Sequence, residues 1–378
     1  MSTDFDIAIC GAGPVGLTLA ALLVKRGMPP SRIALIDAKT VEHNSRDPRS
    51  IALSYGSRQT LEAIGAWPVA ATQINEIHVS RRGHFGRTLI NRVEYDLPAL
   101  GYVTRYGALI TALNAQAATL GVSLIRPATV LAIDEQTEAV TLTFADRASL
   151  QARIVVQAEG GIFSEQTRKN MHRDYGQTAV VAHVTASKPI AHRAFERFTD
   201  EGPLALLPQE DGYALVWCVR PESAARLLGL ADAQFLAELG NAFGTRLGSF
   251  VSVTPRNAFP LGLNAQPNAS QRAIAIGNAA QTLHPVAGQG LNLGLRDATV
   301  LARLLSRQAE PSALKDFLTA RQSDRNMTIH LTDIMARIFA SAPAGAPSQA
   351  ILGVSLGLVD GIKPAKRLLA EQMMFGRR

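Results

Sequence analysis

The chain has 378 residues, 47% of them hydrophobic, and a formal net charge of +7. This length and composition are sufficient for one large core or two fused cores. The basic residues are scattered and form no recognition motif, so the charge does not predict a nucleic-acid partner. The eight histidines lack ligand spacing, which predicts no metal site. Cys10 and Cys218 lie in apolar runs, which predicts buried thiols in a reducing cytoplasm.

The N-terminal segment has the pattern of a dinucleotide-binding turn. A predicted strand at residues 6–10 is followed by glycines, a helix at 17–26, and a second strand at 33–36 that ends in Asp37. The turn contains Gly11, Gly13, Pro14 and Gly16. In such a turn the first glycine permits the bend, the second admits a pyrophosphate, and the third lets the helix pack closely. The acid after the second strand is placed to bind a ribose.

Two other interpretations of this segment are weaker. Glycines that serve packing alone are disfavoured because strand, helix and acid are all in place. A membrane or signal segment is suggested by the lack of charge between Ile7 and Val24. However, the preceding residues are acidic, and Gly-Ala-Gly-Pro interrupts the apolar run.

Alternating apolar and polar residues predict strands in two inserted segments. Residues 179–184 and 213–217 are clear examples, and they predict a second, largely antiparallel sheet. A strand at 151–156 leads into a turn at Glu159. We predict an α/β protein with a discontinuous Rossmann-like domain, an inserted sheet domain and C-terminal helices. The Rossmann-like domain is predicted to comprise residues 1–73, 101–175 and 271–333. The inserted sheet domain comprises residues 74–100 and 176–270, and the C-terminal helices lie within 334–378.

A second glycine-rich turn lies far along the chain. An apolar run at 273–280 precedes Gly288-Gln289-Gly290, and apolar residues then recur at helical spacing from Leu291 to Leu305. The glycines leave the first backbone amides of the helix uncovered. These amides and the helix dipole together form a site for an anionic group. Two such turns suggest one cofactor bound at both ends. FAD fits better than NAD, because a helix start stabilises the negative charge of a reduced flavin ring.

Apolar and basic residues occur together near the C-terminus. The apolar stretch 351–359 is followed by Lys363, Lys366, Arg367 and Arg377-Arg378. The pattern is typical of a helix lying on an anionic membrane surface. A helix packed on the nucleotide domain with a solvated basic face explains it equally well. Neither interpretation predicts a transmembrane span, so we expect a cytoplasmic protein with peripheral contact at the inner face of the membrane.

Several stretches resemble the class A FAD-dependent aromatic hydroxylases, the para-hydroxybenzoate-hydroxylase-like family. Within this family the chain is most similar to the ubiquinone-biosynthesis hydroxylases, closest to the UbiH-type 2-polyprenyl-6-methoxyphenol hydroxylases. The resemblance fades after about Asp333, and its most specific part runs from Gly277 to Pro285. The matching stretches are residues 11–16, 47–53, 79–84, 193–199, 202–205, 215–218, 277–294 and 321–325.

The resemblance implies a flavoprotein hydroxylase fold of the GR2 type and a monooxygenase reaction. NAD(P)H would dock transiently and reduce FAD, and one oxygen atom of O2 would then enter a polyprenylated phenol. Other ubiquinone-biosynthesis proteins are expected partners. Three alternatives remain open: a different ring position or aromatic substrate, an FAD-dependent dehydrogenase, and a non-catalytic flavoprotein subunit of a quinone-synthesis assembly.

The resemblance also implies roles for individual residues. Pro285, Gly288 and Gly290 would form the catalytic position beside the flavin ring, where the carbonyl group of Pro285 faces the substrate. The residues expected to bind FAD are Gly11, Gly13, Pro14, Gly16, Asp37, Arg49, Arg105, Glu159, Asn278, Gly288, Gln289, Gly290, Leu291 and Asn292.

Two of these residues depart from the family pattern. Glu159 stands where the family has Asp in an Ala-Asp-Gly motif for FAD and NAD(P)H, and it keeps the charge. Asn278 replaces a ribitol-binding carboxylate, and its amide can still bond to a hydroxyl group. For His284, a structural hydrogen bond is favoured over acid–base catalysis. Arg197 and Trp217 are candidates for the substrate pocket, although an aromatic residue on a strand more often belongs to a core.

Overall fold

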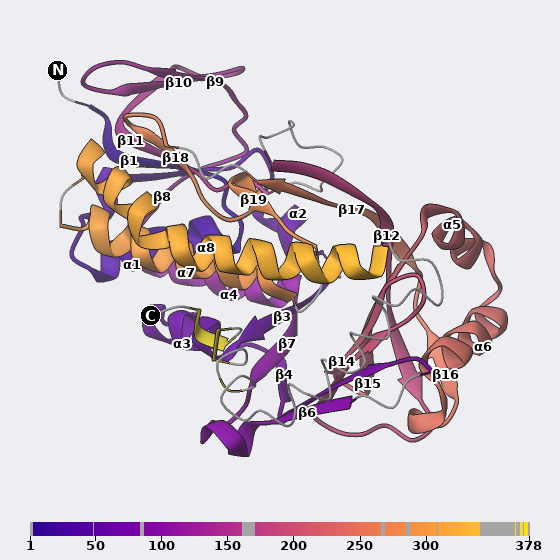
Figure 1. Cartoon of the computed structure of the whole chain (residues 1–378). Coiled ribbons are helices and arrows are strands. Elements are labelled where there is room, and N and C mark those ends of the chain that lie inside the picture. The colour runs from indigo at the N-terminus through magenta and orange to yellow at the C-terminus, as the bar shows by residue number, and fades with distance from the viewer. Residues whose placement is uncertain are drawn as a thin grey trace.

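The computed structural model describes residues 3–47, 49–83, 87–160, 171–265, 269–284, 288–307, 309–340, 367, 371, 372 and 374–376. The strands form three sheets. Long helices lie together beside the first sheet, and two shorter helices lie at the far end of the molecule beside the second (Figure 1).

The first sheet is mainly parallel and contains the N-terminal strand. Its order is β8-β2-β1-β11, and β11 also pairs with parallel β18 and antiparallel β10, which pairs with β9. Ile7 and Ile9 of β1 are fully buried, as expected for a central strand covered on both faces. The strands are β1 (Phe5–Cys10), β2 (Ile33–Ile36), β8 (Ser123–Ile125), β9 (Val130–Glu135), β10 (Val140–Phe144), β11 (Leu150–Gln157) and β18 (Ala273–Ala275).

The two faces of this sheet belong to different cores. Ile7 and Ile9 pack with residues of α1, α4, α7 and α8, whereas Ala8 and Cys10 pack with residues of β10 on the other face. The period-2 alternation of β1 produces this division. The helices of this part are α1 (Pro14–Lys25), α2 (Val41–Ser45), α3 (Tyr55–Ile64), α4 (Tyr106–Thr119), α7 (Gln289–Leu305) and α8 (Pro311–Ala340), with a short 3-10 helix η5 (Gly277–Ala279) before α7.

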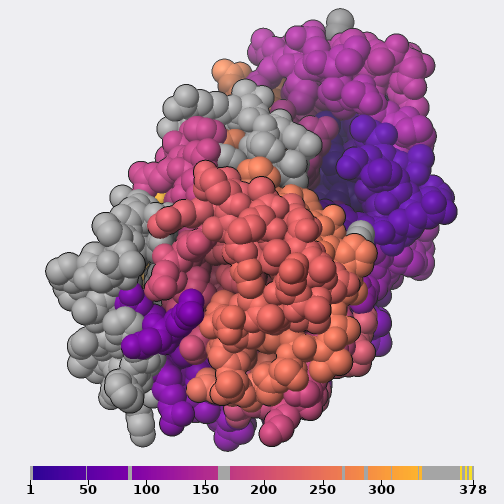
Figure 2. Space-filling model, turned by 90° about the vertical axis from the view of Figure 1, so that its right-hand side faces the viewer, coloured from indigo at the N-terminus to yellow at the C-terminus, as the bar shows by residue number. Residues whose placement is uncertain are grey.

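The second sheet is mostly antiparallel, in the order β19-β17-β12-β15-β14-β13-β5-β6, with β16 paired to β12. Phe195 and Trp217 point from its outer face into a core with α5 (Pro221–Gly229) and α6 (Asp232–Phe243). This side of the molecule, in salmon, faces the viewer in Figure 2. The strands are β5 (Glu76–Arg81), β6 (Arg87–Asn91), β12 (Met171–Ala186), β13 (Arg193–Phe198), β14 (Pro203–Gln209), β15 (Gly212–Val219), β16 (Phe250–Val253), β17 (Asn257–Ala265) and β19 (Gln281–Thr282).

A small third sheet, β3-β7-β4, lies between the other two parts of the fold (Figure 1). It consists of β3 (Ser50–Ser54), β4 (Ala71–Ile74) and β7 (Gly101–Arg105). The predicted α/β class with a second, antiparallel sheet is confirmed. The predicted domain boundaries stay a prediction, and most of the C-terminal segment 334–378 lies outside the described residues.

Two smaller expectations concern thiols and membrane spans. Cys10 and Cys218 are both buried and free, as predicted. Among the residues that the structure describes, no helix combines the length and the hydropathy needed to cross a membrane.

A buried ion cluster fastens α8 to α7. Asp297 of α7 is fully buried and contacts Arg321 and Arg325 of α8, each at 2.8 Å. Burial by itself would raise the pKa of Asp297, but the two guanidinium groups outweigh it and lower the pKa. Removal of one partner from such a cluster leaves an uncompensated buried charge.

Helix α1 packs closely on α7, because a glycine of α7 lies against Val15. A Cβ atom on Gly294 would lie 2.7 Å from Val15 Cγ2 and 3.1 Å from Gly277 Cα. No side chain fits this space. Both helices begin at the same side of the sheet as a result, and their N-termini lie next to each other.

This packing predicts opposite effects for the same substitution in two helices. Gly294→Ala should destabilise the protein by about 1–3 kcal/mol, because the methyl group overpacks the contact with Val15. Gly240→Ala in α6 is the matched control. Outside the backbone of α6, no atom of the described residues lies within 4 Å of the added carbon, so the free energy of unfolding should rise by about 0.5–1 kcal/mol. Urea unfolding of both variants measures the difference. Equal stability of the two variants would show that the α1–α7 contact is not tight.

Candidate functional site

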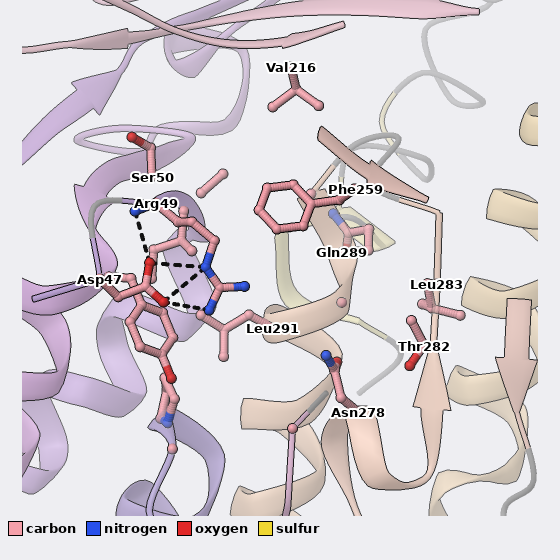
Figure 3. A pocket seen from close by; sticks show the side chains of 18 of the residues that line it. Asp47, Arg49, Ser50, Val216, Phe259, Asn278, Thr282, Leu283, Gln289 and Leu291 are labelled. Atoms are coloured by element: carbon pink, nitrogen blue, oxygen red, sulfur yellow. Dashed lines mark hydrogen bonds and ion pairs between the residues drawn. The ribbon is translucent and has the colours of Figure 1, made fainter. Parts of the chain in front are cut away.

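A cavity of about 1600 Å³ lies where the N-termini of α1 and α7 face the antiparallel sheet. This volume exceeds that of ordinary small-ligand pockets, roughly 300–1,000 Å³. Figure 3 shows Asp47 and Arg49 on one side of it and Gln289 and Asn278 on the other. Val216 and Phe259 project into the cavity from strands of the sheet (Figure 3).

The three glycines before α1 have different surroundings. Gly11 has a φ of +107°, and a Cβ there would lie 2.7 Å from the backbone of Ala158; a Cβ on Gly16 would lie 1.9 Å from the carbonyl oxygen of Gly11. Gly13 differs, because a Cβ would meet only Tyr106 Oη, at 3.7 Å. Gly11 and Gly16 therefore satisfy the backbone packing, while the space beside Gly13 belongs to the cavity.

Asp37 lies at the end of β2, in the wall of the same cavity. Its carboxylate accepts hydrogen bonds from the backbone amides of Ala12, at 2.6 Å, and Lys39, at 2.7 Å. Glu159 also lines this end, and its pKa is raised by burial and by the charge of Asp37. The two carboxyl groups therefore lie near enough to repel each other.

The second helix start has an open backbone. Gly288 is the N-cap of α7 with a φ of +60°, and Gly288, Gln289, Gly290 and Leu291 all line the cavity. Apart from the backbone of α7 itself, no atom of the described residues lies within 4 Å of the position where a Cβ on Gly290 would be. Asn278, in the preceding 3-10 helix, lines the cavity below them (Figure 3).

The side chain of Asn292 is used within the protein. It accepts from the amide of Ser54 at 2.8 Å and from Ser57 Oγ at 2.7 Å, and it donates to the carbonyl oxygens of Ala52 and Gly288. These bonds attach the start of α7 to β3 and α3. The backbone amide of Asn292, rather than its side chain, is the group that we expect to face a ligand.

Arg49 lines the cavity and pairs with a neighbouring acid. Its guanidinium donates to Asp47, with Nη2–Oδ2 at 2.7 Å, and lies over the ring of Tyr106 at 5.1 Å. The hydrogen bond to Asp47 raises the pKa of Arg49. Arg105, by contrast, is not among the lining residues and binds Glu210 through two bonds of 2.8 Å.

His284 is buried, and its Nε2 lies 3.0 Å from Gln177 Oε1. Burial lowers its pKa to about 4, so it is neutral at physiological pH. These observations support the structural interpretation of His284. Pro285, which follows it, lies outside the described residues.

Trp217 and Arg197 do not line the cavity. Trp217 packs on Phe235 of α6, with ring centroids 6.1 Å apart, and Arg197 donates to the carbonyl oxygen of Ala242. Both side chains face α6, on the side of the sheet away from the cavity. They therefore belong to the core between the sheet and α6 and do not form part of a substrate pocket. Within the described ranges, one cluster has potential metal ligands, His183, Glu210 and Asp211; Glu210 is already paired with Arg105.

Sequence reasoning did not single out Tyr106 or Glu196, which both line the cavity. Tyr106 begins α4, directly after the strand that carries Arg105. Glu196 lies between Ala194 and Phe198 on one side of β13. The sequence signal for Glu196 is a carboxyl group whose neighbours on the same face of the strand, at i−2 and i+2, are both apolar.

Comparison with known proteins assigns the family. Residues 4–331 match the family model described as FAD binding domain. The chain is 32% identical over 387 residues to the ubiquinone hydroxylase UbiL of Rhodospirillum rubrum, covering 98% of this chain and 89% of that protein. It is also 32% identical to the 3-demethoxyubiquinol 3-hydroxylase of Escherichia coli, covering 79% of each.

Solved structures share the fold. The p-nitrophenol 4-monooxygenase PnpA from Pseudomonas putida superposes over the full length of both chains, with a TM-score of 0.77 at 18% identity. The chain belongs to the FAD-binding family of class A flavoprotein hydroxylases. It is an FAD-dependent monooxygenase that uses NAD(P)H as the reductant.

The two helix starts fit an FAD molecule that bridges them. The N-cap residues of α1 and α7, Gly13 and Gly288, supply no side-chain cap, and neither helix has an acidic residue in its first turn. In α3, by comparison, Ser54 caps the helix by accepting from Ser57. Uncapped amides need acceptors, which a pyrophosphate at α1 and a flavin ring at α7 would supply.

The space at Gly13 predicts a selective loss of cofactor. Gly13 has a φ of −77°, which any residue can adopt, so Gly13→Val should fold but block the pyrophosphate and yield largely apoprotein. Gly229→Val, at an exposed end of α5 with nothing within 4 Å, should keep full occupancy. Chromatography of the released flavin measures occupancy and should identify FAD, not FMN. Full occupancy in Gly13→Val would refute the role of this turn.

The start of α7 predicts an electrostatic effect on the flavin. Gly290→Asp adds a carboxylate in the first turn, which favours the helix itself but opposes negative charge on a reduced ring. We expect slower reduction and a midpoint potential lower by roughly 20–40 mV, which corresponds to about 1–2 kcal/mol. Gly290→Asn is the uncharged control. An unchanged potential in a folded, FAD-loaded Gly290→Asp protein would contradict the helix-start argument.

Proposed function

We propose that this monooxygenase hydroxylates a polyprenylated phenol of the 2-polyprenyl-6-methoxyphenol type in ubiquinone biosynthesis. The relatives named as a ubiquinone hydroxylase and as a 3-demethoxyubiquinol 3-hydroxylase support the pathway. The division of the cavity supports the substrate class: it is polar at the helix starts and apolar beneath the sheet, where Ile77, Leu207, Val216 and Phe259 line it. That apolar part is the single observation that favours a hydrophobic substrate over a small polar one.

The proposed cofactor contacts follow the geometry. Gly13 and the start of α1 would bind the pyrophosphate, with Asp37 at the adenosine ribose and Arg49 beside the phosphates. Asn278 would bind the ribityl chain. Of the predicted contacts, Arg105 has the least structural support, because its guanidinium already binds Glu210.

The chain's own residues would orient the substrate and exclude water from the cavity. The bound FAD supplies the chemistry of oxygen activation and transfer. The amides at the start of α7 stabilise negative charge in front of that helix. The apolar sheet face above them removes water and seats the ring and tail of the substrate. Contact with membranes or with other biosynthetic proteins stays a prediction.

Oxygen labelling tests this function. Turnover with NAD(P)H, 18O2 and a prenylated methoxyphenol should yield a product that contains one labelled oxygen atom. The phenol should also accelerate NAD(P)H consumption. A tail-less phenol should bind more weakly, by about 0.8 kcal/mol for each methylene lost from the apolar region, and should divert more turnover to hydrogen peroxide. Label found in peroxide alone with every phenol tested would overturn the proposed substrate class.

A further inference from the structure

One charged residue stands out on the cavity side of the antiparallel sheet. The strand residues of this sheet that line the cavity are apolar or uncharged, with the exception of Glu196 among those described. The uncharged ones are Ile77, Val79, Thr88, Ile90, Ala194, Phe198, Ala205, Leu207, Val216, Asn257, Phe259 and Thr282. Phe195 also borders the cavity, although its ring packs in the core on the other face of the sheet. Placing a carboxyl group in such an apolar surface costs free energy of desolvation, so its presence there needs an explanation.

The strand register places Glu196 above the middle of this surface. It pairs with Val79 of β5 on one side and with Ala205 of β14 on the other, and Ala205 pairs in turn with Val216 of β15. Since strands lie about 4.8 Å apart, Glu196 is about 10 Å from Val216 along this row. Figure 3 shows Val216 pointing into the cavity on the side opposite Leu291.

The surroundings of Glu196 make it a proton acceptor near neutral pH. Within the described part of the chain its carboxyl group has no hydrogen-bond or ion-pair partner, and burial raises its pKa to about 7. Two titratable side chains share its face of the sheet, one on the adjacent strand β5 and one on β15, two strands away. Burial lowers the pKa of Arg81 on β5 and raises that of Cys218 on β15. Neither contributes to the shift at Glu196, which is due to burial.

We infer that Glu196 is the group that binds the phenolic hydroxyl of the substrate and accepts its proton during hydroxylation. This inference rests on the proposed phenolic substrate. A phenolic O–H donates a short, charge-assisted hydrogen bond to a carboxylate, and this bond is stronger than one between neutral groups. The aromatic ring would then lie between the sheet and the start of α7, with its tail along the apolar surface.

The proton transfer is balanced within the enzyme–substrate pair. The phenolic O–H bond breaks, its electron pair stays on the phenolic oxygen, and the proton forms an O–H bond with a carboxylate oxygen of Glu196. Negative charge on the oxygen makes the ring more nucleophilic. Once a ring carbon has gained a hydroxyl group, its C–H bond breaks: the electron pair restores the aromatic ring and the proton passes to water. Glu196 then returns the first proton to the phenolic oxygen.

A pair of ligands and a pair of variants test this role in the FAD-loaded enzyme. The ligands are 2-methoxy-6-prenylphenol and its O-methyl ether, which lacks the proton; binding is followed by the flavin absorbance. In Glu196→Gln the phenol should bind roughly tenfold more weakly, while the affinity for the ether stays the same. For the phenol, kcat/KM should fall by about 10²-fold. Glu138→Gln, at an exposed glutamate, is the control and should match the wild type.

The pH profile separates a catalytic role from a structural one. In the wild type, kcat/KM should rise with pH through about 7, because Glu196 must be ionised, and this limb should vanish in Glu196→Gln. Glu196→Asp keeps a titratable group, so the limb should persist at a lower rate. Should Glu196→Gln fail to fold, loss of the limb in folded Glu196→Asp would overturn the inference.

The remaining outcomes are also decisive. Equal loss of affinity for phenol and ether, or an unchanged kcat/KM in folded Glu196→Gln, would overturn the role of Glu196 and leave the proposed function intact. If the wild type incorporates label from 18O2 into no phenol, the proposed function fails, and the role of Glu196 fails with it.

Discussion

The close packing of α1 against α7 brings together the two helix starts at which we propose that FAD binds. These helices begin almost 280 residues apart in sequence, at Pro14 and Gln289. They approach because Gly294 presents no side chain to Val15. The resulting geometry directs two helix N-termini into one cavity, so a single long molecule can satisfy both. The Rossmann-like sheet, the inserted strands and the substrate cavity are all arranged around this pair.

The ion cluster on the far side of α7 makes the arrangement rigid. Asp297 lies two turns beyond the start of α7, and its carboxylate is held from both sides by guanidinium groups of α8. A buried cluster of this kind contributes little net stability compared with apolar packing, but it penalises any shift that separates its members. In the proposed binding mode, the position of the flavin ring along α7 therefore depends on residues that line no part of the cavity.

The sequence was sufficient for the fold class and for much of the cavity wall, because both depend on local patterns. Gly11 and Gly13 can be located from spacing alone, and so can Gly288 and Gly290. Side-chain direction was harder to predict. The spacing could not show that Arg105 would find Glu210, 105 residues away, at 2.8 Å.

The same limit applied to the sheet that covers the cavity. Which face of β13 or β15 meets the cofactor depends on how two sheets pack, and this is a tertiary property. Period-2 alternation separates the two sides of a strand without saying which side meets the ligand. The alternation alone therefore does not show that Trp217 belongs to a core, or that Glu196, in the stretch 193–199, lines the cavity.

The uncapped helix starts have a consequence for the life of the protein in a cell. The glycine N-caps of α1 and α7 supply no side-chain cap, and bound FAD would add acceptors there, so the folded state and the holoenzyme are thermodynamically linked. Binding to the native chain alone stabilises it by about 2.7 kcal/mol when free FAD exceeds its Kd a hundredfold. Scarcity of riboflavin would therefore lower the amount of this enzyme through turnover of the apoprotein, in addition to limiting its catalysis.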